Sequence, residues 1–143
     1  MRPIFILIFA VGVGLVCGET TGVVVRNGEK PGAVIIENHG PPLALASKAL
    51  VERKRGAEWI ASPVLFDLVR ACVAGKVPDS IDLPSGATLK PVPWTGYTCS
   101  GQCPRSCRSN HYAGEGIFRF VFFRADHSER FTGPEFALPA ETP

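Results

Sequence analysis

The chain has 143 residues, with 15 Lys or Arg residues against 13 Asp or Glu residues and a formal net charge of +2. This near-neutral balance argues against a protein dominated by phosphate binding. The sequence contains no Gly-x-Ser-x-Gly elbow, no His-Glu-x-x-His motif and no phosphate-binding loop, so the enzyme classes built on these motifs are excluded.

Residues 1–18 have the layout of a secretory signal peptide. One basic residue precedes the apolar run Ile4–Cys17, which at about 14 residues is shorter than the roughly 20 that a membrane-spanning helix needs. The small residues Val16 and Gly18 fit a cut before Glu19. A buried strand, a membrane anchor and a lipoprotein signal are the alternatives, the last disfavoured because Val16 stands where a smaller residue is expected. We predict a secreted, extracellular protein that has no membrane partner.

Residues 19–55 contain β-prone runs followed by a helix-like run. Val23–Val25 and Ala33–Ile36 flank a turn-rich link, which predicts a hairpin. In the stretch "LALASKALVERKR" three apolar residues have helical spacing: Leu43, Ala46 and Leu50.

The helix-like run ends at the basic pair Lys54-Arg55. One interpretation is a solvated helix end, where cations complement the helix dipole. The other is a processing site of the kind that kexin-type proteases cut. In that case residues 19–55 are a propeptide and residues 56–143 are the mature domain.

Ser62–Gly75 is predicted to be a helix. Ser62 is a good N-cap, Pro63 suits the first helical position, and Gly75 is a natural stop. One apolar face would hold Leu65, Leu68, Val69 and Cys72.

The remaining elements are predicted to be strands. Residues 87–94 contain prolines that suit an edge strand, and Gly116–Arg124 is a dense aromatic and β-branched run that suits a buried one. Residues 130–139 are its expected partner. We therefore predict an α+β fold in which one N-terminal α-helix packs on a small antiparallel β-sheet.

Four cysteines remain after signal removal, which in an exported chain indicates two disulfides that staple the helix to the sheet. They are Cys72, Cys99, Cys103 and Cys107. Three connectivities stay open. A zinc site with His111 is the alternative, but the spacing lacks the usual tight Cys-x-x-Cys turn. We predict no metal and no cofactor.

Arginines and aromatic residues gather around the cysteine-rich segment and near its flanks. This combination suits a protein interface, and it also suits RNA through stacking and phosphate contacts. A solvated loop is the simpler interpretation of residues 105–112. The predicted contact residues are Trp94, Tyr97, Arg105, Arg108, His111, Tyr112 and Arg124.

Residues 60–138 resemble the fungal guanyl-specific ribonucleases and the secreted effectors built on that scaffold. The resemblance rests on the predicted helix, the turn-rich segment after it and the stretch "GIFRFVFFRADHSERFTG". It implies a carboxylate, an arginine and a histidine placed on successive strands. Here Glu115 and Arg119 lie too close together for two strands, and His111 and His127 lie in turns, so the catalytic set is broken.

We therefore predict a secreted, non-catalytic effector that binds a host protein, with entry into host cells as one route to its target. A small ribonuclease-like toxin using Glu115, Arg119, His111 and His127 is the first alternative, with RNA as its partner. A secreted inhibitor or defence protein is the second.

Overall fold

The computed structural model describes residues 22–69, 78–97 and 111–140. Every regular secondary-structure element in these ranges is a β-strand. They are β1 (Val23–Asn27), β2 (Val34–Asn38), β3 (Leu43–Ala46), β4 (Lys48–Arg55), β5 (Glu58–Asp67), β6 (Ser80–Leu83), β7 (Thr88–Leu89), β8 (Gly116–Phe123), β9 (Arg130–Thr132) and β10 (Phe136–Leu138).

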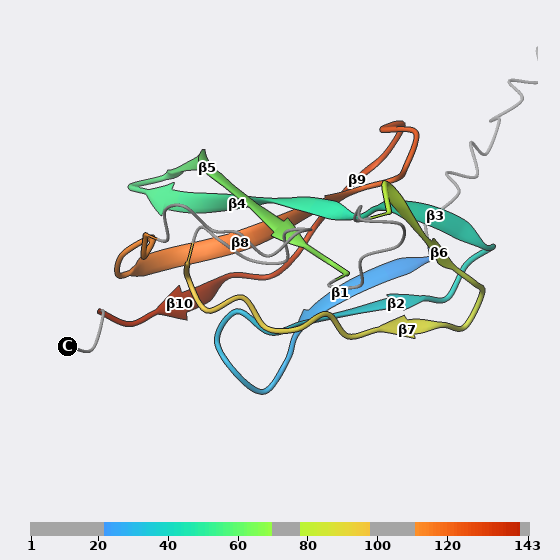
Figure 1. Cartoon of the computed structure of the whole chain (residues 1–143), viewed down its shortest axis with the longest axis horizontal. Helices are drawn as coiled ribbons and strands as arrows, with labels where there is room; N and C mark the ends of the chain where they lie inside the picture. The colour runs from blue at the N-terminus through green and yellow to red at the C-terminus, as the bar shows by residue number, and fades with distance from the viewer. Residues whose placement is uncertain (1–21, 70–77, 98–110, 141–143) are drawn as a thin grey trace, which may run out of the picture.

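The strands form three antiparallel sheets. The large sheet has the order β10-β8-β4-β5, with β9 also paired to β8, and the small sheet has the order β1-β2-β7. Strands β3 and β6 form a separate two-stranded ribbon. Figure 1 shows the large and small sheets as two layers, and one hydrophobic cluster joins them, so the fold is a β-sandwich.

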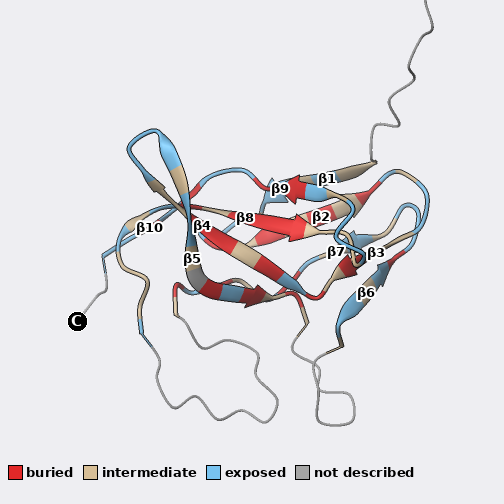
Figure 2. Cartoon of the chain, turned by 90° about the horizontal axis from the view of Figure 1, so that it is seen from above, coloured by how far each residue is buried: buried red, intermediate tan, exposed pale blue. Residues whose placement is uncertain are grey.

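The core between the layers is strongly aromatic. The ring centres of Phe66 and Phe120 lie 4.6 Å apart, and those of Phe120 and Phe136 lie 4.8 Å apart. Trp94 meets Phe118 edge-on at 5.5 Å. Each such pair contributes about 0.5–1.5 kcal/mol beyond the burial of its area. Figure 2 shows how the buried residues concentrate on β2, β4 and β8.

The predicted helix Ser62–Gly75 is wrong over its described part. Its beginning lies in β5, where Val64, Phe66 and Leu68 are at most 4% exposed while Leu65 is 44% exposed. This alternation is that of a strand with one face in the core. The apolar residues fit both the period of a helix and the period of a strand, and the pairing of β5 with β4 decides in favour of the strand. Because no helix occurs among the described residues, the α+β class is also wrong and the described fold is all-β.

The helical spacing in the run from residue 43 to residue 55 is also misleading. This run forms β3 and β4, and Leu45, Ala49 and Val51 are completely buried. Alanine, leucine, lysine and glutamate favour helices only weakly. Strand β4 is hydrogen-bonded to β5 on one side and to β8 on the other, and this pairing overrides the propensity.

Several strand predictions are confirmed. Strands β1 and β2 form the predicted hairpin, with Val25 opposite Ile36. The predicted buried strand is β8, in which Phe120 and the adjacent Val121 point to opposite faces and are both buried. Strands β9 and β10 return to pair with it, and β7 is an edge strand whose one partner among the described strands is β2.

The predicted signal peptide lies outside the described residues. Residues 22–55 form β1 to β4 and contribute to the same core as the rest of the chain. The Lys54-Arg55 pair ends β4, next to an exposed two-residue turn that begins at Gly56 with a φ of 60°. Cleavage at this turn stays a prediction. No described helix is long and apolar enough to cross a membrane.

Candidate functional site

The sequence predicts Trp94 to be an exposed contact residue, and the structure corrects this. Only 1% of Trp94 is exposed, and its indole Nε1 donates a hydrogen bond to the Tyr97 carbonyl at 2.9 Å. Its backbone N–H donates to the Gly32 carbonyl at 2.9 Å, which fixes the proline-rich segment against the small sheet. Trp94 is therefore a core residue and not a contact residue.

The predicted contact residues Tyr97 and Tyr112 lie side by side. They form an isolated antiparallel bridge, and their ring centres are 5.3 Å apart. The Tyr112 hydroxyl donates a hydrogen bond to the Pro139 carbonyl. Arg105 and Arg108 lie outside the described residues, as do all the cysteines, so the disulfide and zinc predictions stay untested.

The four residues of the ribonuclease alternative are not brought together. Glu115 precedes β8 and His127 lies in the turn after it, so they flank a strand of eight residues. At roughly 3.4 Å per residue this strand spans about 27 Å. Arg119 lies between them and bonds to Glu52, while His111 is exposed beside Tyr112.

Arg119 belongs to an ion network on the outer face of the large sheet. The Glu52 carboxylate accepts from Arg119 Nε at 2.7 Å and from Arg130 Nη2 at 2.8 Å, and the Arg119 guanidinium lies 4.2 Å from the centre of the Trp59 ring. Arg130 lies opposite Phe123 and Glu52 lies opposite Arg119, four residues away along β8, so the Arg130 side chain must extend across the row that holds Val121. This explains why Val121 is fully buried on an outer face. We interpret the network as a stabilising one.

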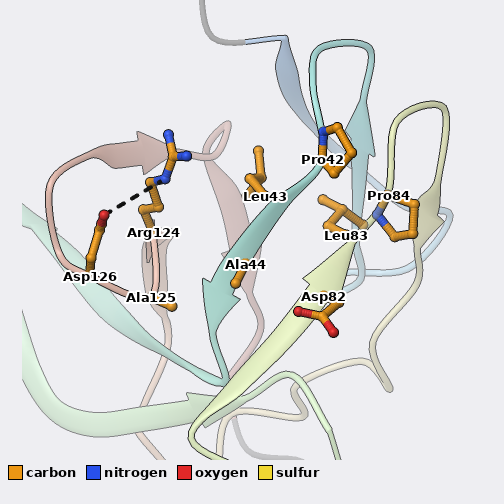
Figure 3. A pocket seen from close by; sticks show the side chains of 9 residues that line it. All are labelled: Pro42, Leu43, Ala44, Asp82, Leu83, Pro84, Arg124, Ala125 and Asp126. Atoms are coloured by element: carbon orange, nitrogen blue, oxygen red, sulfur yellow. Dashed lines mark ion pairs between the residues drawn. The ribbon is translucent and has the colours of Figure 1, made fainter.

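A trough of about 460 Å³ lies between the β3–β6 ribbon and the turn after β8. Figure 3 shows β3 between a wall from β6 and a wall that carries Arg124 and Asp126. Arg124 Nε lies 4.0 Å from Asp126 Oδ2, and its Nη1 lies 3.8 Å from Glu129. The predicted contact residue Arg124 is thus already paired with acids. With Asp82 also in the lining, the trough carries a small excess of negative charge.

A second cavity, of about 280 Å³, lies at the other end of β8, beside the β4–β5 hairpin. We call it the basic pocket. Its apolar surface comes from Phe118, Ile60 and Ala61. Arg53 and Arg55 reach the same side of β4 because they are two residues apart in a strand. The full lining is Arg53, Arg55, Ile60, Ala61, Ser62, Tyr112, Ala113 and Phe118.

Arg53 is held rigidly in this pocket. Its Nη2 donates to the Glu115 carbonyl at 2.6 Å and its Nη1 donates to the Ala113 carbonyl at 3.3 Å. Its guanidinium also lies 5.6 Å from the centre of the Phe118 ring. Arg55, at the end of β4, is exposed.

The arginines of the basic pocket lack acidic partners. The other described arginines, which are Arg26, Arg119, Arg124 and Arg130, each lie within ion-pair distance of a carboxylate. Within the described part of the chain, neither Arg53 nor Arg55 does, and no acidic residue lines the pocket. Glu58 lies opposite Arg55 in the hairpin but forms no ion pair with it. Two guanidinium groups that form no ion pair, beside an apolar surface, can bind an anion, and their planar forks suit a carboxylate.

The sequence predicted one residue of this pocket as a contact residue, Tyr112, and assigned Arg55 only to processing. It missed Arg53. The signal was the alternation in Arg53-Lys54-Arg55, in which the middle residue points away and binds Glu135 at 2.9 Å. That alternation becomes visible only when the run is treated as a strand.

Comparison of the chain with protein-family models, curated proteins and solved structures finds no match. No group of three metal-binding side chains occurs among the residues that the structure describes. The function therefore has to be argued from the geometry of the pockets.

Proposed function

We propose that this protein is a non-catalytic binding protein whose basic pocket accepts a carboxylate from an acidic segment of a partner protein. The observation that carries the proposal is the pairing pattern of the described arginines. Among the arginines that the structure describes, only Arg53 and Arg55 lack an ion-paired carboxylate, and both line one pocket. With the predicted export signal, we propose an extracellular or host protein as the partner.

The size and surface of the pocket favour a single acidic side chain. Its volume of about 280 Å³ is at the lower limit of small-molecule sites, which typically hold roughly 300–1,000 Å³. Ile60 and Phe118 can contact the methylene groups of a glutamate while the arginines bind its carboxylate. A nucleic acid is a poorer fit, because binding to a phosphate backbone depends on many cations and the chain has a net charge of only +2.

The two arginines have different tasks in this proposal. Arg53 is fixed by two backbone carbonyls, so it supplies positive charge without losing side-chain freedom on binding. The side chain of Arg55 has no described hydrogen bond and supplies its donors directly to the ligand. One charge-assisted hydrogen bond contributes about 1.5–3 kcal/mol, which corresponds to roughly a 10- to 150-fold change in affinity.

The proposal is tested by titrating the full-length secreted protein with a capped peptide, acetyl-Ser-Val-Glu-Val-Ser-amide, by calorimetry. We expect Arg55→Gln to weaken binding at least tenfold. Lys30→Gln is the matched control, because it removes one exposed positive charge elsewhere and should leave the affinity unchanged. Equal weakening by both variants, or no effect of Arg55→Gln, would show that the pocket is not the site.

A further inference from the structure

We infer that the acidic segment binds as an added β-strand along the free edge of β5, with its glutamate in the basic pocket. This inference rests on the proposed function and adds the binding mode and the sequence pattern of the ligand. Strand β5 is the last strand of the large sheet and pairs only with β4 among the described strands. An unpaired edge offers its backbone N–H and C=O groups to another extended chain.

The hairpin geometry shows which groups of β5 face outward. Arg55 and Glu58 close a two-residue turn, and the closing pair of such a hairpin is hydrogen-bonded. The pairs then alternate, so the backbone groups of Ile60 point toward β4. Those of Trp59 and Ala61 point away from it and are the groups available to a ligand strand.

The free edge is short, which limits what can bind to it. The pairing of β4 with β5 shifts register between Leu50 and Glu52, and Pro63 has no backbone N–H. A bulge and a proline are common protections against unlimited edge pairing. The regular part of the edge is therefore Glu58–Ala61, enough for a segment of a few residues.

The edge and the basic pocket are in register. Ile60 lies between the two outward-facing residues, lines the pocket and is 40% exposed. In an added strand, the residue opposite Ile60 points to the same side of the sheet, so a glutamate there enters the pocket near Arg55. Its neighbours point to the outer face beside Trp59. The predicted ligand pattern is thus a glutamate between two apolar or β-branched residues.

Charge complementarity argues for a partner segment over a second copy of this chain. A second β5 strand paired antiparallel across Ile60 would place another Ile60 opposite the pocket. Its Glu58 would lie opposite Ser62, four residues along the edge from the Glu58 that faces Arg55, so Arg55 would still lack a carboxylate. An acidic segment supplies that carboxylate. Pairing of two copies is therefore an outcome of the test that would overturn the inference.

The test uses four versions of the capped peptide with the full-length protein: the parent, a glutamine version, one with N-methyl groups on both valines, and one with an N-methyl group on the glutamate. The valine N–H groups should face Trp59 and Ala61, whereas the glutamate N–H should face solvent. We expect at least tenfold weaker binding for the valine-methylated and glutamine versions, and the parent affinity for the glutamate-methylated control. Hydrogen exchange should slow at the amides of Trp59 and Ala61 when the parent binds.

The outcomes separate the two proposals. If both methylated peptides bind like the parent while the glutamine version is weaker, strand addition is wrong and the carboxylate site stands. Equal weakening by both methylations also overturns strand addition. If the glutamine version binds as well as the parent, or if no version binds, the proposed function fails and the inference fails with it. A dimer in sedimentation with Trp59 and Ala61 already protected would show that a second copy occupies the edge.

Discussion

Replacing Glu52 with glutamine should destabilise the fold far more than an ordinary surface substitution. The Glu52 side chain is 10% exposed, and its two carboxylate oxygens accept from Arg119 and Arg130. Glutamine keeps the shape of Glu52 and one of its two oxygens. Its NH2 group, however, would face the N–H donors of one of the two arginines, so that hydrogen bond would be lost. Two arginines would then share the outer face without a counter-charge.

The size of the effect follows from the exposure of each partner. A hydrogen bond to a charged group contributes about 1.5–3 kcal/mol when it is sheltered. The Arg119 side chain is 23% exposed and that of Arg130 is 50% exposed. The bond from Arg130 to Glu52 should therefore contribute an energy at or below the lower end of this range. We expect a loss of about 2–3 kcal/mol in the free energy of unfolding. At roughly 3–4 °C per kcal/mol for a chain of this size, Tm should fall by about 6–12 °C.

Urea unfolding of the two variants Glu52→Gln and Glu37→Gln makes the comparison direct. Glu37 also pairs with an arginine across two strands, at 2.7 Å, but the Arg26 side chain is 52% exposed. The loss of this exposed pair should therefore cost much less stability than the loss of Glu52. If the two variants lose the same stability, the reasoning about the outer-face network is refuted.

Three further predictions concern the body of the fold. Asn38→Ala should cost about 2–4 kcal/mol in urea unfolding, because the fully buried Asn38 amide donates to the Pro41 and Leu83 carbonyls and would leave them unpaired; a loss below 1 kcal/mol would contradict this. Burial raises the pKa of Asp67, which the charge of Lys48 offsets only in part, so the folded state binds the proton more tightly than the unfolded state and stability falls as pH rises past the ordinary value of 3.8. Asp67→Asn should therefore stabilise the protein at pH 7, and this gain should vanish below pH 3.8; a gain that persists there would have another cause. Finally, cleavage after Arg55 should leave both pieces associated in native mass spectrometry, because β4 is paired with β5 and β8, whereas spontaneous separation would show that residues 56–143 fold alone.

The sequence predicted those strands whose composition leaves no alternative. The aromatic run of β8 and the valine-rich hairpin of β1 and β2 disfavour helix at almost every position, so local preference and final structure agree. Strands β4 and β5 contain alanine, leucine, lysine and glutamate, or apolar residues that fit both periods. The conformation of β4 depends on pairing with the distant strand β8, where Phe120 lies opposite Val51, and β5 in turn pairs with β4. No local pattern contains the information about β8.

The candidate site was predictable only in its residue types. Arginine near tyrosine was a correct general expectation, since Tyr112 does line the basic pocket. The particular arginines were missed because a helix would have spread Arg53 and Arg55 around its axis, whereas a strand places them on one side. Trp94 was misplaced because it was grouped with the aromatic residues that flank the cysteine-rich segment, whereas the structure places it in the core.

Arg55 links the predicted processing site to the proposed binding site. Cleavage between Arg55 and Gly56 would create an α-carboxylate on Arg55 itself, and such a group is ionised at neutral pH because its pKa is about 3.3–3.7. The new negative charge would lie at the rim of the basic pocket, beside the guanidinium groups that are proposed to bind the ligand. It would also release the hairpin that holds Glu58–Ala61 in register with β4. Both effects lower the affinity for the ligand. The cut protein should therefore bind the parent peptide at least tenfold more weakly than the uncut protein in the same calorimetric titration. If the cut protein binds more tightly, the propeptide masks the site, and the uncut chain is its inactive form.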